Sequence, residues 1–148
     1  MKTAAIRIAL FVGSMYLVVG IVFGELAGRA ASAQTRVAWR WAAWLVSGAL
    51  FGAHVVYEQV RLRTSPRISA LHVSAAAALG AFGLAAAANV HAYVASANEH
   101  AFMLALSLAI WPLMTALPAF VVALVAALLF ARMRRSVPFR TSALSDER

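Results

Sequence analysis

Charged side chains divide the chain into four long apolar stretches. No Asp, Glu, Lys or Arg occurs in residues 8–24, 41–57, 68–98 and 100–131. A helix that crosses a bilayer needs about 20 mainly apolar residues, because an ionised group near the bilayer centre is costly. Each stretch therefore predicts one membrane-spanning helix, and we place the four spans at approximately 6–24, 40–58, 67–89 and 101–131.

The third stretch is longer than one span needs and contains its own end. Amides, hydroxyl groups and two histidines interrupt the apolar run from Asn89 to His100, so the span should end near Asn89. Its start is marked by Thr64, Ser65 and Pro66. A hydroxyl group can cap the helix there, and proline fits the first helical position without losing a hydrogen bond.

The fourth stretch also exceeds the thickness of a bilayer. A helix over 101–131 would be about 46 Å long, against a hydrocarbon core of about 30 Å. Pro112 and Pro118 each remove a backbone donor, so we expect a kink between Trp111 and Pro118. The alternative is a short re-entrant segment at 101–111 that precedes a span at 113–131.

The composition agrees with a protein that lies in lipid. Of the 148 residues, 64% are hydrophobic and 12% are charged, and soluble domains carry about 25% charged residues. We predict an all-α integral membrane protein with a single membrane domain. It forms an antiparallel four-helix bundle in up-down-up-down order, with a long, proline-kinked fourth helix and a short cytoplasmic tail at 136–148. The sequence contains no cysteine, which excludes disulfides, iron–sulfur clusters and cysteine nucleophiles.

The basic residues are distributed unevenly between the two sides of the predicted bundle. Ten of the thirteen flank the spans on the side of the termini: Lys2, Arg7, Arg61, Arg63, Arg67, Arg132, Arg134, Arg135, Arg140 and Arg148. Only Arg29, Arg36 and Arg40 lie on the other side. Basic residues accumulate on the cytoplasmic side of membrane proteins, so we predict cytoplasmic N- and C-termini in a bacterial-type inner or plasma membrane.

A cleaved signal peptide is the alternative for the N-terminal segment. Two basic residues, an apolar run and the small residues Ala31, Ser32 and Ala33 precede Gln34 in the order typical of a signal peptide. The apolar run over 8–24 is longer than the usual signal-peptide core of about 7–15 residues, which favours a retained span. The orientation of the later spans is the same in both cases.

Small residues recur at helical spacing within three of the spans. The glycines expected to pack helices are Gly20, Gly24 and Gly28 in span one, Gly48 and Gly52 in span two, and Gly80 and Gly83 in span three. Small residues on one face let helix backbones approach closely in lipid. These glycines can pack the bundle internally or dock another membrane protein. The glycine series of span one is the better candidate for docking.

The tryptophans and the positive charge both point to the lipid surface. Trp39, Trp41 and Trp44 lie at the outer end of span two, where aromatic rings prefer the headgroup level. A stacking site for a sugar or a quinone is the alternative. The net charge of +8 comes from residues beside the spans, so we expect anionic lipid headgroups as partners and no binding to nucleic acid.

Four histidines and one glutamate are the residues most suited to chemistry. His54 and Glu58 are four residues apart, which places both on one helical face. His72 lies about one and a half turns into the next, antiparallel span, so it should lie at a similar depth. On the outer side, His91 ends span three and His100 begins span four, where Glu99 and Glu25 are also expected.

These residues allow three functional hypotheses. Histidine pairs among His54, His72, His91 and His100 could ligate haem b. His54, Glu58 and His72 could bind a divalent metal such as zinc or iron. Histidine and glutamate within spans could also conduct ions or protons. The structural alternative is that these groups lie in the polar interface, where Glu58 pairs with Arg61 or Arg63.

The sequence carries no motif typical of an enzyme. A glycine-rich phosphate loop, HExxH and GxSxG are not found. The prediction is therefore a non-catalytic accessory, assembly or scaffold subunit that associates through its helices, with another membrane protein or in a homo-oligomer. Haem or metal binding, which needs His54 and His72, is the first alternative, and conduction is the second.

Overall fold

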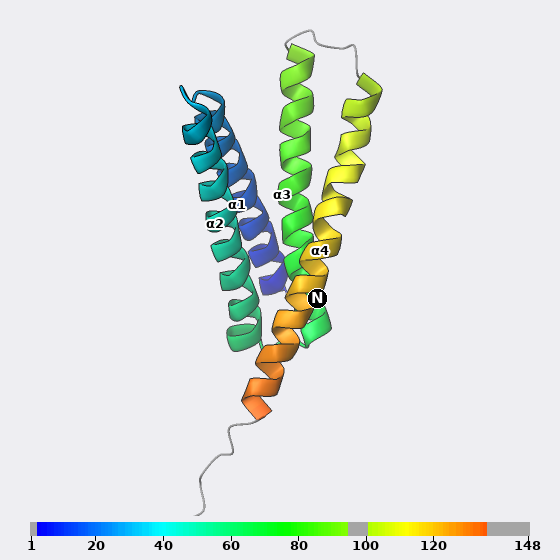
Figure 1. Ribbon diagram of the computed structural model, residues 1–148. Helices are drawn as coiled ribbons and strands as arrows, with labels where there is room; N and C mark the ends of the chain where they lie inside the picture. The colour runs from blue at the N-terminus through cyan, green and yellow to red at the C-terminus, as the bar shows by residue number, and fades with distance from the viewer. Residues whose placement is uncertain (1–2, 95–100, 136–148) are drawn as a thin grey trace, which may run out of the picture.

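The structure is a computed structural model that describes residues 3–94 and 101–135. It has helices and no strand within those residues: α1 (Thr3–Gly28), α2 (Ala33–Tyr57), the short π-helix η1 (Glu58–Leu62), α3 (Pro66–Val94) and α4 (Ala101–Arg135). The chain runs up, down, up and down through the four long helices (Figure 1). The all-helical prediction is confirmed. The predicted tail at 136–148 lies outside the described residues.

The helices are longer than the spans predicted from charge. α3 continues past Asn89 to Val94, and α1 begins at Thr3 and ends at Gly28. Polar residues at a helix end stay helical when they reach the interface, because water or headgroups satisfy their side chains. α4 is one continuous helix through Pro112 and Pro118. The re-entrant alternative, which needs a break between 111 and 113, is therefore excluded. The kink between Trp111 and Pro118 stays a prediction.

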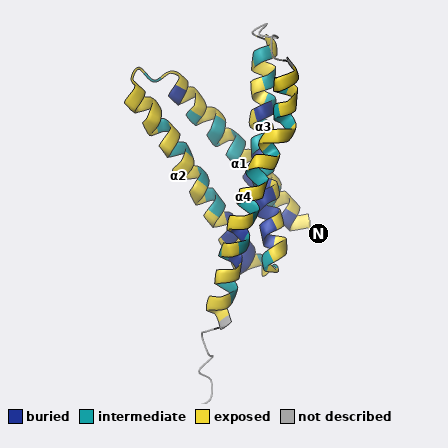
Figure 2. Ribbon diagram, turned by 45° about the vertical axis from the view of Figure 1, so that its right-hand side comes forward, coloured by how far each residue is buried: buried dark blue, intermediate teal, exposed yellow. Residues whose placement is uncertain are grey.

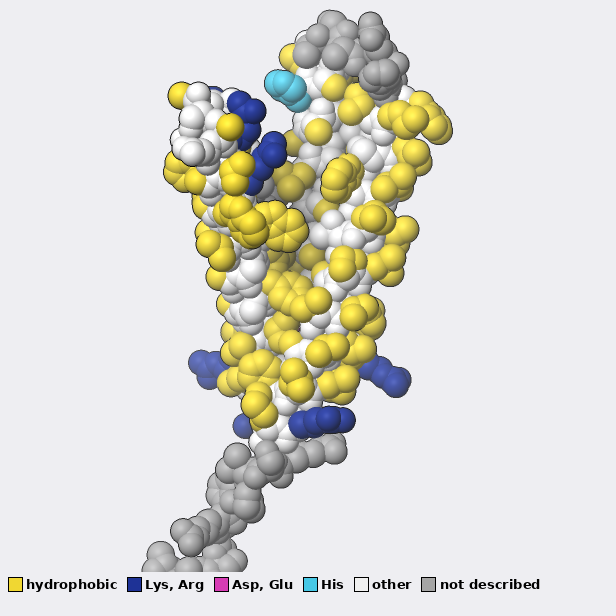
Figure 3. Space-filling model, in the orientation of Figure 1, with side chains coloured by type: hydrophobic (Ala, Val, Ile, Leu, Met, Phe, Trp, Pro, Cys, Tyr) yellow, Lys and Arg dark blue, Asp and Glu magenta, His cyan; other side chains and the backbone are white. Residues whose placement is uncertain are grey.

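Three of the described helices are long and apolar enough to cross a membrane: α1, α3 and the part of α4 from Phe102 to Arg134. Large apolar side chains remain exposed along them, including Phe11 at 63% and Trp111 at 61%. Such extensive apolar exposure is rare in soluble proteins. A hydrophobic surface covers the middle of the molecule and basic side chains lie towards its two ends (Figure 3). These features indicate an integral membrane protein.

α2 is not among the helices that are apolar enough to span a membrane by composition. Arg36 and Arg40 lie in its first half, and His54 lies in its last turn. These polar groups lower the apolar content that a span requires. The four-span bundle therefore remains a proposal for this helix.

The helices form two hairpins, α1 with α2 and α3 with α4. The hairpins approach each other at the end where α2 leads into α3, and they diverge towards the opposite end (Figure 1). Buried residues gather at the closed end (Figure 2). There, Val55 of α2, Ala70 and Val73 of α3, and Ala123 of α4 form one apolar core. The arrangement is a bundle that is packed at one end and splayed at the other.

Glycines bring α1 and α3 into close contact. A Cβ atom on Gly80 of α3 would lie 2.5 Å from Cβ of Tyr16, and a Cβ atom on Gly20 of α1 would lie 2.6 Å from the Leu84 side chain. Gly13 faces Leu79. A Cβ atom on Gly83 would lie 3.0 Å from the Leu17 side chain. Glycine is required at Gly80, because its neighbour is a Cβ atom that the α1 backbone holds in place, whereas the leucine side chains beside the other three glycines can shift.

Polar contacts fix the two hairpins near the open end. Asn89 of α3 donates from Nδ2 to the Leu104 carbonyl of α4 at 2.9 Å and to Ser107 Oγ at 3.2 Å. α2 begins at a Ser32 cap, whose Oγ accepts from the Thr35 backbone at 3.1 Å. The rings of Phe23 and Trp39 then pack α1 against α2 with centroids 6.0 Å apart.

We predict that Gly80→Ala loosens the α1–α3 contact. The new methyl group would meet Cβ of Tyr16 and the Gly13 carbonyl at 2.5 and 3.2 Å, and such overpacking costs about 1–3 kcal/mol. Thermal unfolding of the detergent-purified protein, followed by circular dichroism, measures the effect.

Gly48→Ala is the matched control, because a Cβ atom there meets nothing within 4 Å. It should keep or raise Tm, since alanine favours helix over glycine by up to about 1 kcal/mol. Equal Tm values for the two variants would contradict the contact.

Candidate functional site

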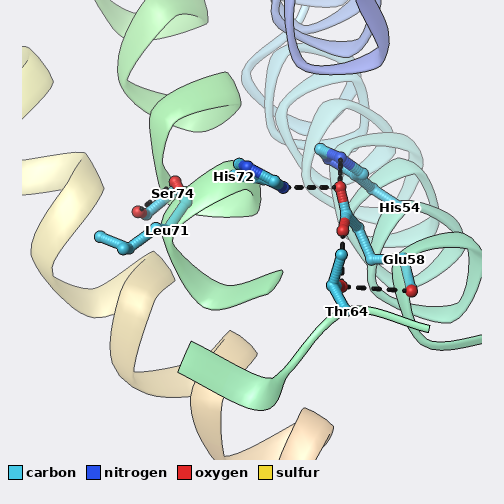
Figure 4. Close-up of polar contacts among 6 residues, drawn as sticks. All are labelled: His54, Glu58, Thr64, Leu71, His72 and Ser74. Carbon is cyan, nitrogen blue, oxygen red and sulfur yellow. Dashed lines mark hydrogen bonds and ion pairs between the residues drawn. The ribbon is translucent and has the colours of Figure 1, made fainter. Parts of the chain in front are cut away.

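The closed end of the molecule contains a buried polar cluster of His54, Glu58 and His72. The side chain of Glu58 is fully buried, and His54 and His72 are exposed by only 2% and 5%. The three side chains point towards one another from α2, η1 and α3 (Figure 4). Buried ionisable groups in membrane proteins are rare and are commonly functional. This cluster is therefore the candidate site.

Glu58 Oε1 is the atom on which both imidazoles converge. His72 Nδ1 lies 3.0 Å from it, at hydrogen-bond distance. His54 Nε2 lies 3.8 Å from the same oxygen, which is too long for a hydrogen bond. One proton therefore lies between Glu58 and His72, on one atom or the other, and His54 is the second imidazole in reach of the carboxylate.

The π-turn after α2 brings Thr64 to the other carboxylate oxygen. The helix widens at Glu58–Leu62, and Arg63 closes the turn in the left-handed conformation at φ 49°. The Thr64 backbone N–H then donates to the Glu58 carbonyl at 3.3 Å. This folding back places Thr64 Oγ1 2.8 Å from Glu58 Oε2, to which it donates. π-Helical turns are frequent at functional sites.

The turn is also tied to the end of α4. Arg134 Nη2 donates to the Gln59 carbonyl at 2.6 Å. The widened π-turn frees carbonyl groups that an α-helix would pair internally, and a guanidinium group can satisfy them. α2, α3 and α4 therefore all contribute to the frame around Glu58.

Several buried polar atoms near this end have no hydrogen-bond partner among the described residues. They are both ring nitrogens of His54, Nε2 of Gln59 and Oγ of Ser69. Most buried polar atoms in proteins are hydrogen-bonded, and exceptions call for an explanation such as a functional role. His54 is thus buried beside a carboxylate, and neither of its ring nitrogens forms a hydrogen bond with a described residue.

The structure distinguishes the histidines that sequence spacing grouped together. His54 and His72 lie at one depth with Glu58, as expected for antiparallel neighbours. His91 is exposed in the last turn of α3 and does not join this cluster. His100 and Glu99 lie outside the described residues.

The metal and haem hypotheses concern the same cluster. Within residues 3–94 and 101–135, no group of three or more His, Cys, Asp or Glu side chains is arranged to hold a metal ion. The assignments of His54, Glu58 and His72 to a metal and of the histidines to haem b stay predictions.

Two features of the site were not predicted from sequence. A hydroxyl group of Thr64 or Ser65 was expected to cap α3; that of Thr64 donates to Glu58, and Pro66 does begin the helix. Glu58 was expected to pair with Arg61 or Arg63 if it had only a structural role, and it binds His72 and Thr64 instead. A Glu–Thr spacing of six residues across a turn carries no periodic signal.

The packing glycines also divide into two groups. Gly20, Gly80 and Gly83 lie in the α1–α3 contact together with Gly13, which the four-residue spacing overlooked. The spacing of seven residues between Gly13 and Gly20 is the signal that identifies it. Gly24, Gly28, Gly48 and Gly52 would meet no described atom within 4 Å if they carried a Cβ. These four glycines form open helix faces.

Comparison of the chain with family models, with curated proteins and with solved structures found no match. The functional argument therefore depends on the geometry of this molecule.

We predict that the two histidines differ in their contributions to stability. His72→Leu leaves Glu58 Oε1 buried without its hydrogen-bond partner, which costs about 1–3 kcal/mol. His54→Leu removes a ring that forms no hydrogen bond with the described residues and should leave Tm unchanged or raise it. Thermal unfolding in one detergent compares the two variants. A larger loss of Tm for His54→Leu than for His72→Leu would contradict the assigned contacts.

Proposed function

We propose that the protein is a four-span integral membrane protein of a bacterial-type inner or plasma membrane, with cytoplasmic N- and C-termini. Three apolar helices support this proposal. α2 packs along α1 in an antiparallel hairpin and exposes Trp41 at 65% and Leu45 at 72%. These apolar side chains would be covered by lipid if α2 also crosses the bilayer.

We propose that the protein acts as a non-catalytic accessory, assembly or scaffold subunit through helix–helix association. The supporting observation is the set of four open glycines. Gly24 and Gly28 on α1, and Gly48 and Gly52 on α2, face no described atom within 4 Å, whereas the other four glycines are in close contact. Because glycine weakens an isolated helix, an open glycine face is best used where another backbone approaches. The occupant would be a helix of another membrane protein or of a second copy of this chain.

Gly24→Leu is expected to disrupt this association. The leucine side chain would fill the open face of α1 and keep a partner helix away, which should weaken association by about tenfold, or 1–2 kcal/mol. Sedimentation in detergent and the yield of co-purified membrane proteins measure the effect.

Val22→Leu is the control, because Val22 is already exposed on another face of α1. Gly24→Leu with an unchanged oligomeric state and unchanged co-purifying proteins would overturn the proposal. An equal loss of association in Val22→Leu would do the same.

Proton conduction is a second candidate function, and the buried carboxylate between two imidazoles favours it. Glu58 Oε1 lies at hydrogen-bond distance, 3.0 Å, from His72 Nδ1, and His54 Nε2 lies 3.8 Å from the same oxygen. Histidine and glutamate side chains within membrane spans are typical members of proton relays. Proton exchange would then link α2 and α3 at the cytoplasmic end.

For this candidate, proteoliposomes that contain the protein should show a proton flux. Glu58→Gln should abolish the flux, because an amide cannot exchange a proton at that position. Glu25→Gln is the control, since Glu25 forms an exposed ion pair with Arg29 and should not affect transfer. Absence of flux in the wild-type protein, or an equal flux in Glu58→Gln, would exclude conduction through this cluster.

A further inference from the structure

The outer halves of α1 and α2 enclose an open groove that the helix-association proposal does not explain. Its volume is about 520 Å³. Its lining includes Gly24 and Gly28 of α1, and Arg36, Arg40 and Trp44 of α2. Because the two helices are antiparallel, Arg36 lies at the level of the α1–α2 turn, and Trp44 lies deeper in the molecule.

The two arginines in the groove have no compensating charge. Arg36 and Arg40 are one helical turn apart on the same face of α2, and neither side chain forms a hydrogen bond or ion pair with a described residue. Within residues 3–94 and 101–135, the acidic side chains are Glu25 and Glu58. Glu25 pairs with Arg29 at 3.0 Å, and Glu58 is buried at the opposite end. Neither of these two carboxylates therefore lies beside Arg36 or Arg40.

The groove is polar at one end and apolar at the other. The arginines lie towards the turn, while Gly20, Phe23 and Ala43 continue the lining towards the middle of the helices. Basic side chains at this end of the molecule lie beside the space between the two hairpins (Figure 3). Trp44 is exposed at 76% beside this groove, as is typical of side chains at the headgroup level. A ligand that fits must carry an anionic head and an apolar tail.

We propose that this groove binds one anionic phospholipid, with its phosphate group between Arg36 and Arg40 and an acyl chain beside Phe23 and Ala43. Guanidinium groups bind phosphate oxygens through paired N–H donors, and they are weakly hydrated for a cation. The site gives a function to a basic pair on the side of the membrane where basic residues are otherwise few.

Native mass spectrometry of the full-length, detergent-purified protein tests the proposal. The probes are phosphatidylglycerol, phosphatidylcholine and inorganic phosphate. The wild-type protein should retain phosphatidylglycerol about thirtyfold better than phosphatidylcholine, as two arginines at the lipid surface allow. Arg36→Gln combined with Arg40→Gln should remove this preference. Arg29→Gln removes one positive charge at the same end and should keep the preference, because Arg29 is already paired with Glu25.

Three results would overturn the lipid site: equal retention of the two lipids by the wild-type protein, an unchanged preference in the double variant, and displacement of phosphatidylglycerol by inorganic phosphate at equal concentration. If the double variant does not keep its helix content, Ala43→Phe fills the groove without a change of charge. Ala43→Phe should lower retention at least tenfold, and unchanged retention would overturn the proposal.

The lipid site and helix association can fail separately. The arginine variants leave all glycines in place, so their oligomeric state should match that of the wild-type protein. Loss of lipid binding with unchanged association supports the lipid site. Loss of association alone in the double variant would show that the arginines bind a partner protein, and it would overturn the lipid site.

Discussion

The contact between α1 and α3 determines the arrangement of the other helices. Gly13 and Gly20 on one helix and Gly80 and Gly83 on the other allow the two backbones to approach. In lipid, where the hydrophobic effect between helices is weak, this close packing is a main source of association. It joins the α1–α2 hairpin to the α3–α4 hairpin along only part of their length. The hairpins therefore diverge towards one end (Figure 1), and Gly24 and Gly28 have no described atom within 4 Å of a Cβ position.

The closed end depends on a polar interaction. Glu58 holds the start of α3 through His72 and the turn itself through Thr64, and Arg134 attaches α4 to the same turn. An unpaired carboxylate in such a buried place would be costly, so these partners must be present together. The two ends thus differ in character: one is closed around a buried carboxylate, and the other holds an open groove lined by two arginines.

Much of the secondary structure could be predicted from the positions of charged residues. The four apolar stretches correspond to the four long helices, and Pro66 marks the start of α3. The ends were predicted less well, because residues such as Asn89 and His91 remain helical where their side chains find an acceptor or the interface. His54 and Glu58 could be paired by helical spacing, and His72 could be added because short loops make antiparallel neighbours. Thr64 could not be predicted as a partner of Glu58, because the two meet through a π-turn and no periodic pattern in the sequence indicates such a turn.

The sequence by itself determined an all-helical chain that belongs in lipid. Charged groups are costly inside a bilayer, so long stretches without them mark the segments that can lie there, and a segment in lipid must satisfy its backbone as a helix. It also determined which residue types could carry chemistry. Only the tertiary structure decided which glycines touch a neighbour and which remain open, because that depends on the crossing of α1 and α3 and not on spacing within one helix. It likewise decided that Glu58 binds His72 and Thr64 rather than an arginine, because partners in space are set by the fold of the turn.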